Sequence, residues 1–163
     1  MLTVSNTSPI SNLASIGRLE FLKFQFSVVW IPDAVAVELA AHPDPDARQA
    51  IQNAVREQWI RTGTPQDSRL LRVLLLQLHQ GEAEAIALAT DMKANIALID
   101  EQEARQFASR TGLTVTGVLG ILLRAKRDGQ IAAIKPEIDL LRSKARFFVA
   151  ASLEAKVLSA AGE

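Results

Sequence analysis

Residues 2–17 read LTVSNTSPISNLASIG. A short apolar run with β character ends at Ser5, and helical character follows at once. Ser8 is the expected N-cap, Pro9 the first helical residue and Gly17 the stop signal. Asn6 therefore stands where a strand is followed by a helix. Which fold class the sequence predicts depends on whether the same strand-to-helix transition recurs further along the chain.

The transition recurs several times. Further strands are expected at residues 26–31, 59–63, 95–100 and 113–117, and helices at 32–42, 44–59, 68–78, 81–94, 101–111 and 118–128. Strands that alternate with helices indicate a parallel sheet covered on both faces. We therefore predict an α/β fold, a three-layer sandwich with a central parallel sheet of four to five strands flanked by helices.

Size and composition favour one globular domain over residues 1–163, in which residues from about 135 to 163 form C-terminal helices. Apolar residues make up 48% of the chain and aromatic residues only 5%, which predicts a mainly aliphatic core. The chain has no cysteine. Disulfides, thiolate metal sites and thiol catalysis are thereby excluded, and a reducing compartment is expected. No signal peptide and no membrane-spanning run is recognisable, so we expect a cytoplasmic protein.

Charge is balanced overall but unevenly distributed. The formal net charge is zero, which disfavours non-specific nucleic-acid binding over the whole surface. Residues 105–146, however, hold nine basic and three acidic side chains. This segment fits either solvated helix faces or a basic rim beside an acidic centre.

Polar and acidic residues follow the predicted strands, where ligands of such sheets gather. They are Asn6, Glu38, Glu82, Glu84 and Asp100. Carboxylates that converge without histidine or cysteine suit Mg²⁺ or Mn²⁺. Such ions activate water and stabilise charge in phosphodiester hydrolysis.

Each acidic residue also has a purely structural interpretation. Asp100 fits the N-cap of the next helix, with Glu103 completing a capping box. Glu38 fits the solvent side of an amphipathic helix, and Glu82 and Glu84 are favoured near a helix N-terminus by the macrodipole. Their joint placement at one sheet edge is what indicates a site.

Four segments carry a resemblance to a known family: VSNTSPISNLA (4–14), IPDAVAVELA (31–40), GEAEAIALA (81–89) and ALIDEQEARQFASRTGLTVTGVLGILLRAKRDGQI (97–131). Over roughly residues 2–146 the chain resembles the PIN-domain family, the fold of VapC-type toxin ribonucleases. The resemblance implies a parallel sheet between helices and a ring of acidic residues. It also implies Mg²⁺- or Mn²⁺-dependent cleavage of single-stranded RNA.

The resemblance assigns roles residue by residue. It implies catalytic carboxylates at Glu38, Glu82 and Asp100, and metal ligands at these three and at Asn6. Glu84 and Glu103 are the auxiliary acids, and Thr7 or Ser8 supplies the hydroxyl that accompanies the first acid. Apart from the resemblance, we expect Arg105, Arg124 and Lys126 of the basic segment to contact the RNA backbone.

Asn6 departs from the family pattern, which has an aspartate at this position. Its carbonyl oxygen can bind a cation, but it carries no charge and cannot act as a base. Two hypotheses stay open: an endoribonuclease, the toxin of a type II toxin–antitoxin pair, or a catalytically weak or inactive module that binds nucleic acid or protein. The resemblance also implies RNA, a cognate antitoxin and a second copy of the chain as partners. A phosphatase or receiver domain would need a nucleophilic aspartate in place of Asn6.

Overall fold

The computed structural model describes residues 1–163 and contains one five-stranded parallel sheet. The strands are β1 (Thr3–Ser5), β2 (Val29–Pro32), β3 (Ile60–Gly63), β4 (Ile96–Leu98) and β5 (Val115–Thr116). Their order across the sheet is β3-β2-β1-β4-β5, and Val4 of the central strand pairs with Trp30 on one side and Ala97 on the other. Because all five strands run the same way, their carboxyl ends meet at one edge.

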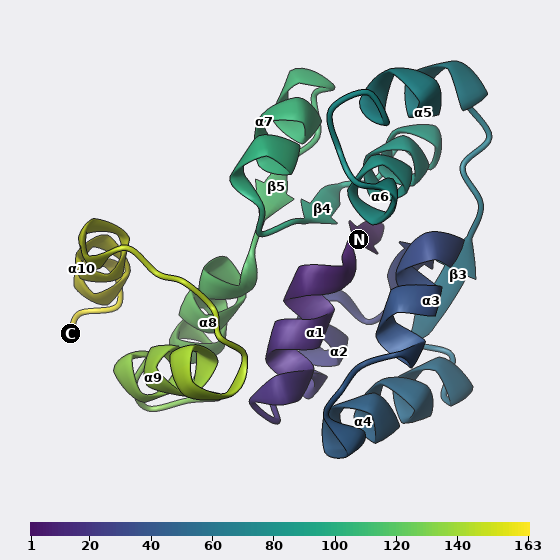
Figure 1. Cartoon of the computed structure of the whole chain (residues 1–163). Coiled ribbons are helices and arrows are strands. Elements are labelled where there is room, and N and C mark those ends of the chain that lie inside the picture. Colours follow the sequence, from purple (N-terminus) through teal and green to yellow (C-terminus); the bar gives the residue numbers. More distant parts are fainter.

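Ten helices complete a three-layer α/β sandwich around the sheet (Figure 1). They are α1 (Thr7–Ser15), α2 (Glu20–Phe26), α3 (Asp33–Ala40), α4 (Pro45–Arg56), α5 (Ser68–Leu74), α6 (Gln80–Asp91), α7 (Gln102–Arg110), α8 (Val118–Arg127), α9 (Lys135–Lys144) and α10 (Ala151–Ala160). None of them combines the length and the hydrophobicity needed to cross a bilayer.

The two faces of the sheet carry separate hydrophobic cores of unequal size. The larger, of 27 buried residues, includes Ile10 and Leu13 of α1, Val35 of α3 and much of α8 and α9. The smaller, of 13 residues, is formed by α6, α7 and the end of α5, and is rich in alanine. The larger core therefore joins most of the helices, and the smaller one holds α6 and α7 against the opposite face.

The predicted alternation of strands and helices is confirmed, with two differences in detail. Helix α1 begins at Thr7, not after Ser8, because Asn6 keeps an extended backbone (φ −84°, ψ −170°) and serves as N-cap. Helix α2, for which the sequence pattern gave no prediction, packs Phe21, Leu22 and Phe26 into the larger core.

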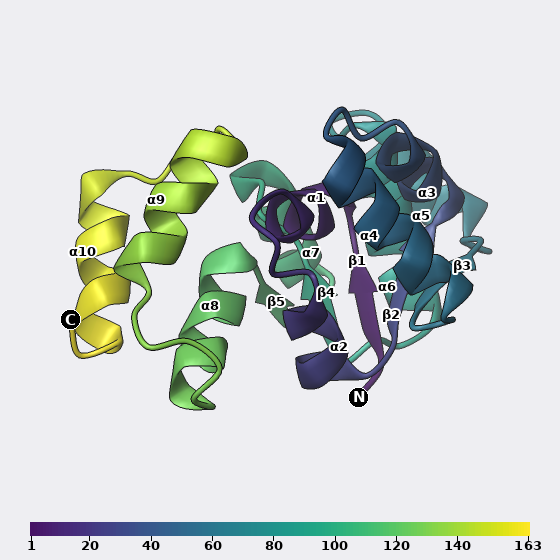
Figure 2. The same cartoon turned by 90° about the horizontal axis from the view of Figure 1, so that it is seen from below.

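The two C-terminal helices lie at one end of the molecule beside α8 (Figures 1 and 2). Helix α9 is held to the α1–α2 connection by an ion pair between Arg18 Nη2 and the buried Glu137 Oε1, 2.8 Å apart. The Glu163 carboxylate accepts hydrogen bonds from the N–H groups of Ile134 (2.6 Å) and Lys135 (3.1 Å), and pairs with Lys126 at 2.7 Å. These contacts fix the start of α9.

Candidate metal centre

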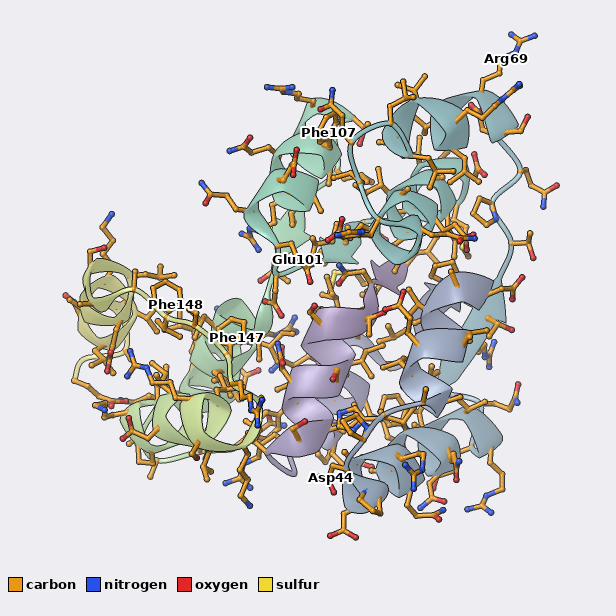
Figure 3. The ribbon with its side chains drawn as sticks, in the orientation of Figure 1. Asp44, Arg69, Glu101, Phe107, Phe147 and Phe148 are labelled. Atoms are coloured by element: carbon orange, nitrogen blue, oxygen red, sulfur yellow. The ribbon has the colours of Figure 1, made fainter.

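An acidic cleft of about 360 Å³ opens at the carboxyl edge of the sheet. Its lining residues are Asn6, Thr7, Ser8, Glu38, His79, Gly81, Glu82 and Glu101. Three are carboxylates, and none is lysine or arginine. Figure 3 shows Glu101 beside the start of α1. The cleft is therefore a site of uncompensated negative charge, suited to a cation.

The cleft is formed jointly by both helical layers. The end of β1 with α1 and α3 supplies one half of the lining, and the N-termini of α6 and α7 supply the other. Helices that follow parallel strands begin at the carboxyl edge, which is why segments far apart in sequence meet there.

Asn6 lies at the floor of the cleft and is only 2% exposed. Its backbone N–H donates to the carbonyl of Leu98 (3.1 Å), which ties the end of β1 to β4. Its Nδ2 donates to Glu101 Oε2 at 2.7 Å. Its Oδ1, which is equally buried, has no hydrogen-bond partner in the protein. A buried acceptor without a partner is costly, so this oxygen is a position where a ligand is expected.

Two hydroxyl groups next to Asn6 hold two of the carboxylates in place. Thr7 Oγ1 donates to Glu38 Oε2 at 2.7 Å, and Ser8 Oγ donates to Glu101 Oε1. Each acid keeps a second oxygen or free lone pairs toward the cleft. The strand-to-helix turn after β1 thus orients acids from α3 and from the start of α7.

Glu82 is positioned by the helix to which it belongs. Its Oε2 accepts a hydrogen bond from the His79 N–H (3.1 Å) at the N-cap of α6. Burial raises the pKa of Glu82, and the nearby charges of Glu101 and Glu103 raise it further. Glu82 therefore caps the start of α6, where the macrodipole favours an acid, and also lines the cleft.

Gly81 makes room for Glu38. A Cβ atom at Gly81 would lie only 2.7 Å from Glu38 Oε1. Because glycine has no side chain, the Glu38 carboxylate of α3 can pack against the first turn of α6.

Asp100 is placed outside the cleft, which corrects its predicted position. Its Oδ1 accepts from the Val118 N–H (2.8 Å) and its Oδ2 from Asn12 Nδ2 (3.3 Å), so it caps α8 and borders a second pocket. Burial raises its pKa to about 6. Side chains alternate in direction along an extended chain, so the next residue, Glu101, faces the cleft instead.

The two auxiliary acids are not in the cleft either. Glu84 Oε2 accepts from the Ala34 N–H at 3.2 Å and Oε1 from Gln80 Nε2 at 2.9 Å, so it satisfies the start of α3. Glu103 is exposed on α7 and does not line the cleft.

Of the three predicted RNA-contacting cations, only Arg105 lies at this edge of the sheet. It donates from Nη1 to the carbonyl of Ile99 (2.8 Å) and borders the same pocket as Asp100. Arg124 lies over the ring of Phe26, and Lys126 pairs with Glu163. Both belong to the last turn of α8, which runs away from the sheet edge.

The donor set fits a hard divalent cation. It consists of oxygen atoms only: three carboxylates and the unpaired Asn6 Oδ1. No three aspartate, glutamate or histidine side chains converge closely enough to enclose an ion by themselves. Mg²⁺ and Mn²⁺ characteristically keep several waters, so fewer protein ligands suffice.

A family model described as a PIN domain (DUF3368) matches residues 2–163. The chain belongs to the PIN-domain family. The structure is also similar to a PilT N-terminus domain protein from the hyperthermophilic archaeon Sulfolobus solfataricus, with a TM-score of 0.50 and 14% sequence identity, covering 77% of this chain and 93% of that one. That likeness concerns the fold alone. A comparison with curated proteins found no match.

The family assignment and the PIN-like sandwich predicted from the sequence are thus confirmed. The fold is of the nuclease type, and PIN domains are generally nucleases that depend on a divalent metal. Glu101 is the residue that the sequence analysis missed. The available signal was the pair of adjacent acids after β4, of which alternation sends one toward the cleft without saying which.

Proposed function

We propose that this PIN domain is an endoribonuclease that hydrolyses phosphodiester bonds of single-stranded RNA with Mg²⁺ or Mn²⁺. The observation that carries the proposal is the unpaired, buried Asn6 Oδ1 in a cleft whose only charged groups are acidic, His79 apart. Such a site lacks a cation to balance it, and a divalent ion is the simplest group that supplies both the charge and the missing contact.

Glu38, Glu82 and Glu101 would hold the ion together with Asn6 Oδ1. This replaces Asp100 of the sequence prediction by Glu101. Thr7 and Ser8 act as positioning residues, since each hydroxyl fixes the carboxylate to which it donates. Asn6 positions Glu101 in the same way through Nδ2.

A divalent ion bound here would supply an activated water and would stabilise charge on the phosphate oxygens. Burial raises the pKa of Glu82 above its ordinary value, and a divalent cation in the cleft would favour its ionised form. Asn6 brings no negative charge, so we expect weaker metal binding than four carboxylates would give.

The test is cleavage of a labelled single-stranded RNA by the purified chain, with Mg²⁺ or Mn²⁺ and with EDTA. We expect metal-dependent cleavage that falls at least about 100-fold in Glu101→Gln, by analogy with loss of one group that stabilises transition-state charge. Glu103→Gln is the matched control, because it removes an exposed acid of the same helix turn and should leave the rate unchanged. Equal rates for wild type and Glu101→Gln would overturn the mechanism.

The acidic cleft also supports the toxin hypothesis. A protein that inserts a lysine or arginine among Glu38, Glu82 and Glu101 would replace the cation and block the site, which is how an antitoxin would act on this geometry. Co-expression of this chain with a neighbouring open reading frame, followed by growth measurements, tests that extension. Toxicity that the neighbour does not relieve would count against it.

The alternative function is a module that binds nucleic acid without cleaving it. The hydrogen bond from Asn6 to Glu101 favours this alternative, because it already satisfies one oxygen of the acid in the absence of metal. Thermal melts decide between the two: a competent site gains stability by mass action as Mn²⁺ rises, and an inactive module does not.

A further inference from the structure

A second hollow of about 590 Å³ lies on the same face of α1 as the acidic cleft, and its lining includes two basic residues, Lys144 and Arg146, with His42 and one acidic residue, Asp44. They belong to the end of α9 and the turn that follows it, which packs beside the middle of α1. Both side chains are exposed, and neither has a carboxylate within ion-pair distance. They form a patch of unpaired positive charge, called here the α9 cationic pair.

One face of α1 connects this pair to the acidic cleft. Ser8 lines the cleft, and Ser11, Asn12 and Ser15 line the second hollow. Residues three, four and seven apart share one side of a helix, so these four polar side chains form a continuous stripe. Its length from Ser8 to Ser15 is about 10 Å at the helical rise.

The other rims of the cleft carry charge of the opposite sign. Glu82 at the start of α6, and Glu101 and Glu103 at the start of α7, would repel a phosphate backbone that ran across them. The stripe of α1 has no acidic residue of its own, although Ser8 and Asn12 donate to the neighbouring Glu101 and Asp100. It leads to two unpaired cations beside one acid, Asp44, so the charge at its far end is more favourable to a polyanion than the acidic rims of α6 and α7.

Arg146 has a second unusual feature. Its φ of 52° lies in the left-handed region, which costs free energy for any residue other than glycine. Glycine is therefore the replacement for Arg146 that this backbone conformation accepts without strain.

We propose that Lys144 and Arg146 bind backbone phosphates of single-stranded RNA on one side of the scissile bond, and that the Ser11 hydroxyl donates a hydrogen bond along the path. The proposal rests on the proposed function, since it needs RNA in the acidic cleft. It also predicts an asymmetry: Lys144 and Arg146 would contact the phosphates of nucleotides on only one side of the scissile bond. Substrates shortened on that side would lose affinity, and substrates shortened on the other would not.

The experiment measures binding of a fluorescein-labelled 12-nucleotide RNA in EDTA, where no cleavage occurs, over a series of salt concentrations. The variant is Lys144→Ala with Arg146→Gly, since glycine accepts the positive φ and removes the charge without strain. We expect about tenfold weaker binding near 100 mM salt. The slope of log K against log salt should fall by about 1.4, the value for two phosphate contacts on a single strand.

The matched control is Arg69→Ala with Lys156→Ala, which removes two exposed cations that have no ion pair, one on α5 and one on α10. Figure 3 shows Arg69 pointing away from the body of the protein. This control should bind as wild type does. Unchanged binding in the Lys144/Arg146 variant, an equal loss in the control, or no RNA binding by wild type would each overturn the proposal.

Cleavage by the same proteins separates this proposal from the proposed function. If wild type cleaves RNA with Mn²⁺ and the Lys144/Arg146 variant binds RNA as tightly as wild type, the nuclease assignment stands and the cationic pair is wrong. If the variant loses affinity while wild type cleaves nothing, the pair is a nucleic-acid contact of a non-catalytic module.

Discussion

The side-chain amide of Asn6 donates a 2.7 Å hydrogen bond to the carboxylate of Glu101, and thereby links the end of the central strand to the start of α7. The other end of the same amide, Oδ1, is buried and has no partner. One residue thus both positions an acid and leaves a buried oxygen without a partner at the floor of the cleft.

Asn6→Asp should destabilise the metal-free protein and strengthen metal binding. The new carboxylate loses the hydrogen bond and faces Glu101 with a like charge, which we expect to lower the free energy of unfolding by about 2 kcal/mol. Added Mn²⁺ should more than recover this loss, because the site gains an anionic ligand. Thermal melts with and without Mn²⁺ measure both effects. A smaller Mn²⁺ response in the variant than in wild type would contradict the prediction.

Glu101→Gln and Asp100→Asn should behave in opposite ways although the residues are adjacent. Glu101→Gln removes a cleft carboxylate, so the Mn²⁺-dependent rise in Tm should be lost. Asp100→Asn should keep that rise, because its carboxyl faces Asn12 and the start of α8. Loss of the metal response in Asp100→Asn alone would restore the assignment made from the sequence.

The ionisation of Asp100 makes the effect of Asp100→Asn on stability depend on pH. Burial raises its pKa to about 6, so the folded protein binds a proton there that the unfolded chain releases at lower pH. Asp100 therefore costs stability as pH rises from about 4 to above 6. Relative to wild type, Asp100→Asn should gain stability across that interval. Melts at pH 4 and pH 7.5 provide the comparison, and a difference that does not change with pH would exclude this effect.

The sequence was sufficient for the architecture because strand and helix signals alternate with little ambiguity. It located Asn6, Glu38 and Glu82 at the cleft for the same reason, since each follows or faces a strand end. It did not distinguish Asp100 from Glu101, because the direction of a side chain in a loop depends on what packs against it, here Asn12 and Val118. It also could not show that Arg124 and Lys126 have partners in α2 and at Glu163, since those contacts are long-range.

Gly81→Ala should reduce activity without reducing stability. Alanine favours the helix by up to about 1 kcal/mol over glycine, but its Cβ would lie 2.7 Å from Glu38 Oε1 and displace that carboxylate. We expect unchanged or higher Tm and a lower rate of RNA cleavage. In a Glu38→Ala background the same substitution should have no further effect on the rate, because the displaced group is already absent. Additive losses would show that Gly81 acts through another contact.

Glu163→Gln should lower the Tm at neutral pH but not in acid. The hydrogen bond and ion pair with Lys126, with the N–H groups at the start of α9, hold the pKa of Glu163 down to about 2. A carboxyl with a depressed folded pKa stabilises the fold above its unfolded pKa of about 4.5, and the contribution is lost as pH falls toward 2. Melts of both proteins at pH 7 and pH 2.5 test this. A Tm difference as large at pH 2.5 as at pH 7 would show that the effect comes from the shape of the side chain and not from its charge.

The acidic cleft takes its lining from helices that belong to two different hydrophobic cores. Asn6, Thr7, Ser8 and Glu38 lie on segments that pack in the larger core, while Glu82 and Glu101 lie at the start of helices that pack in the smaller, alanine-rich one. A shift of one layer against the other would separate the carboxylates while leaving every helix intact. We therefore expect the rate of RNA cleavage to depend on the alignment of the two layers. On warming, this rate should fall before the protein unfolds.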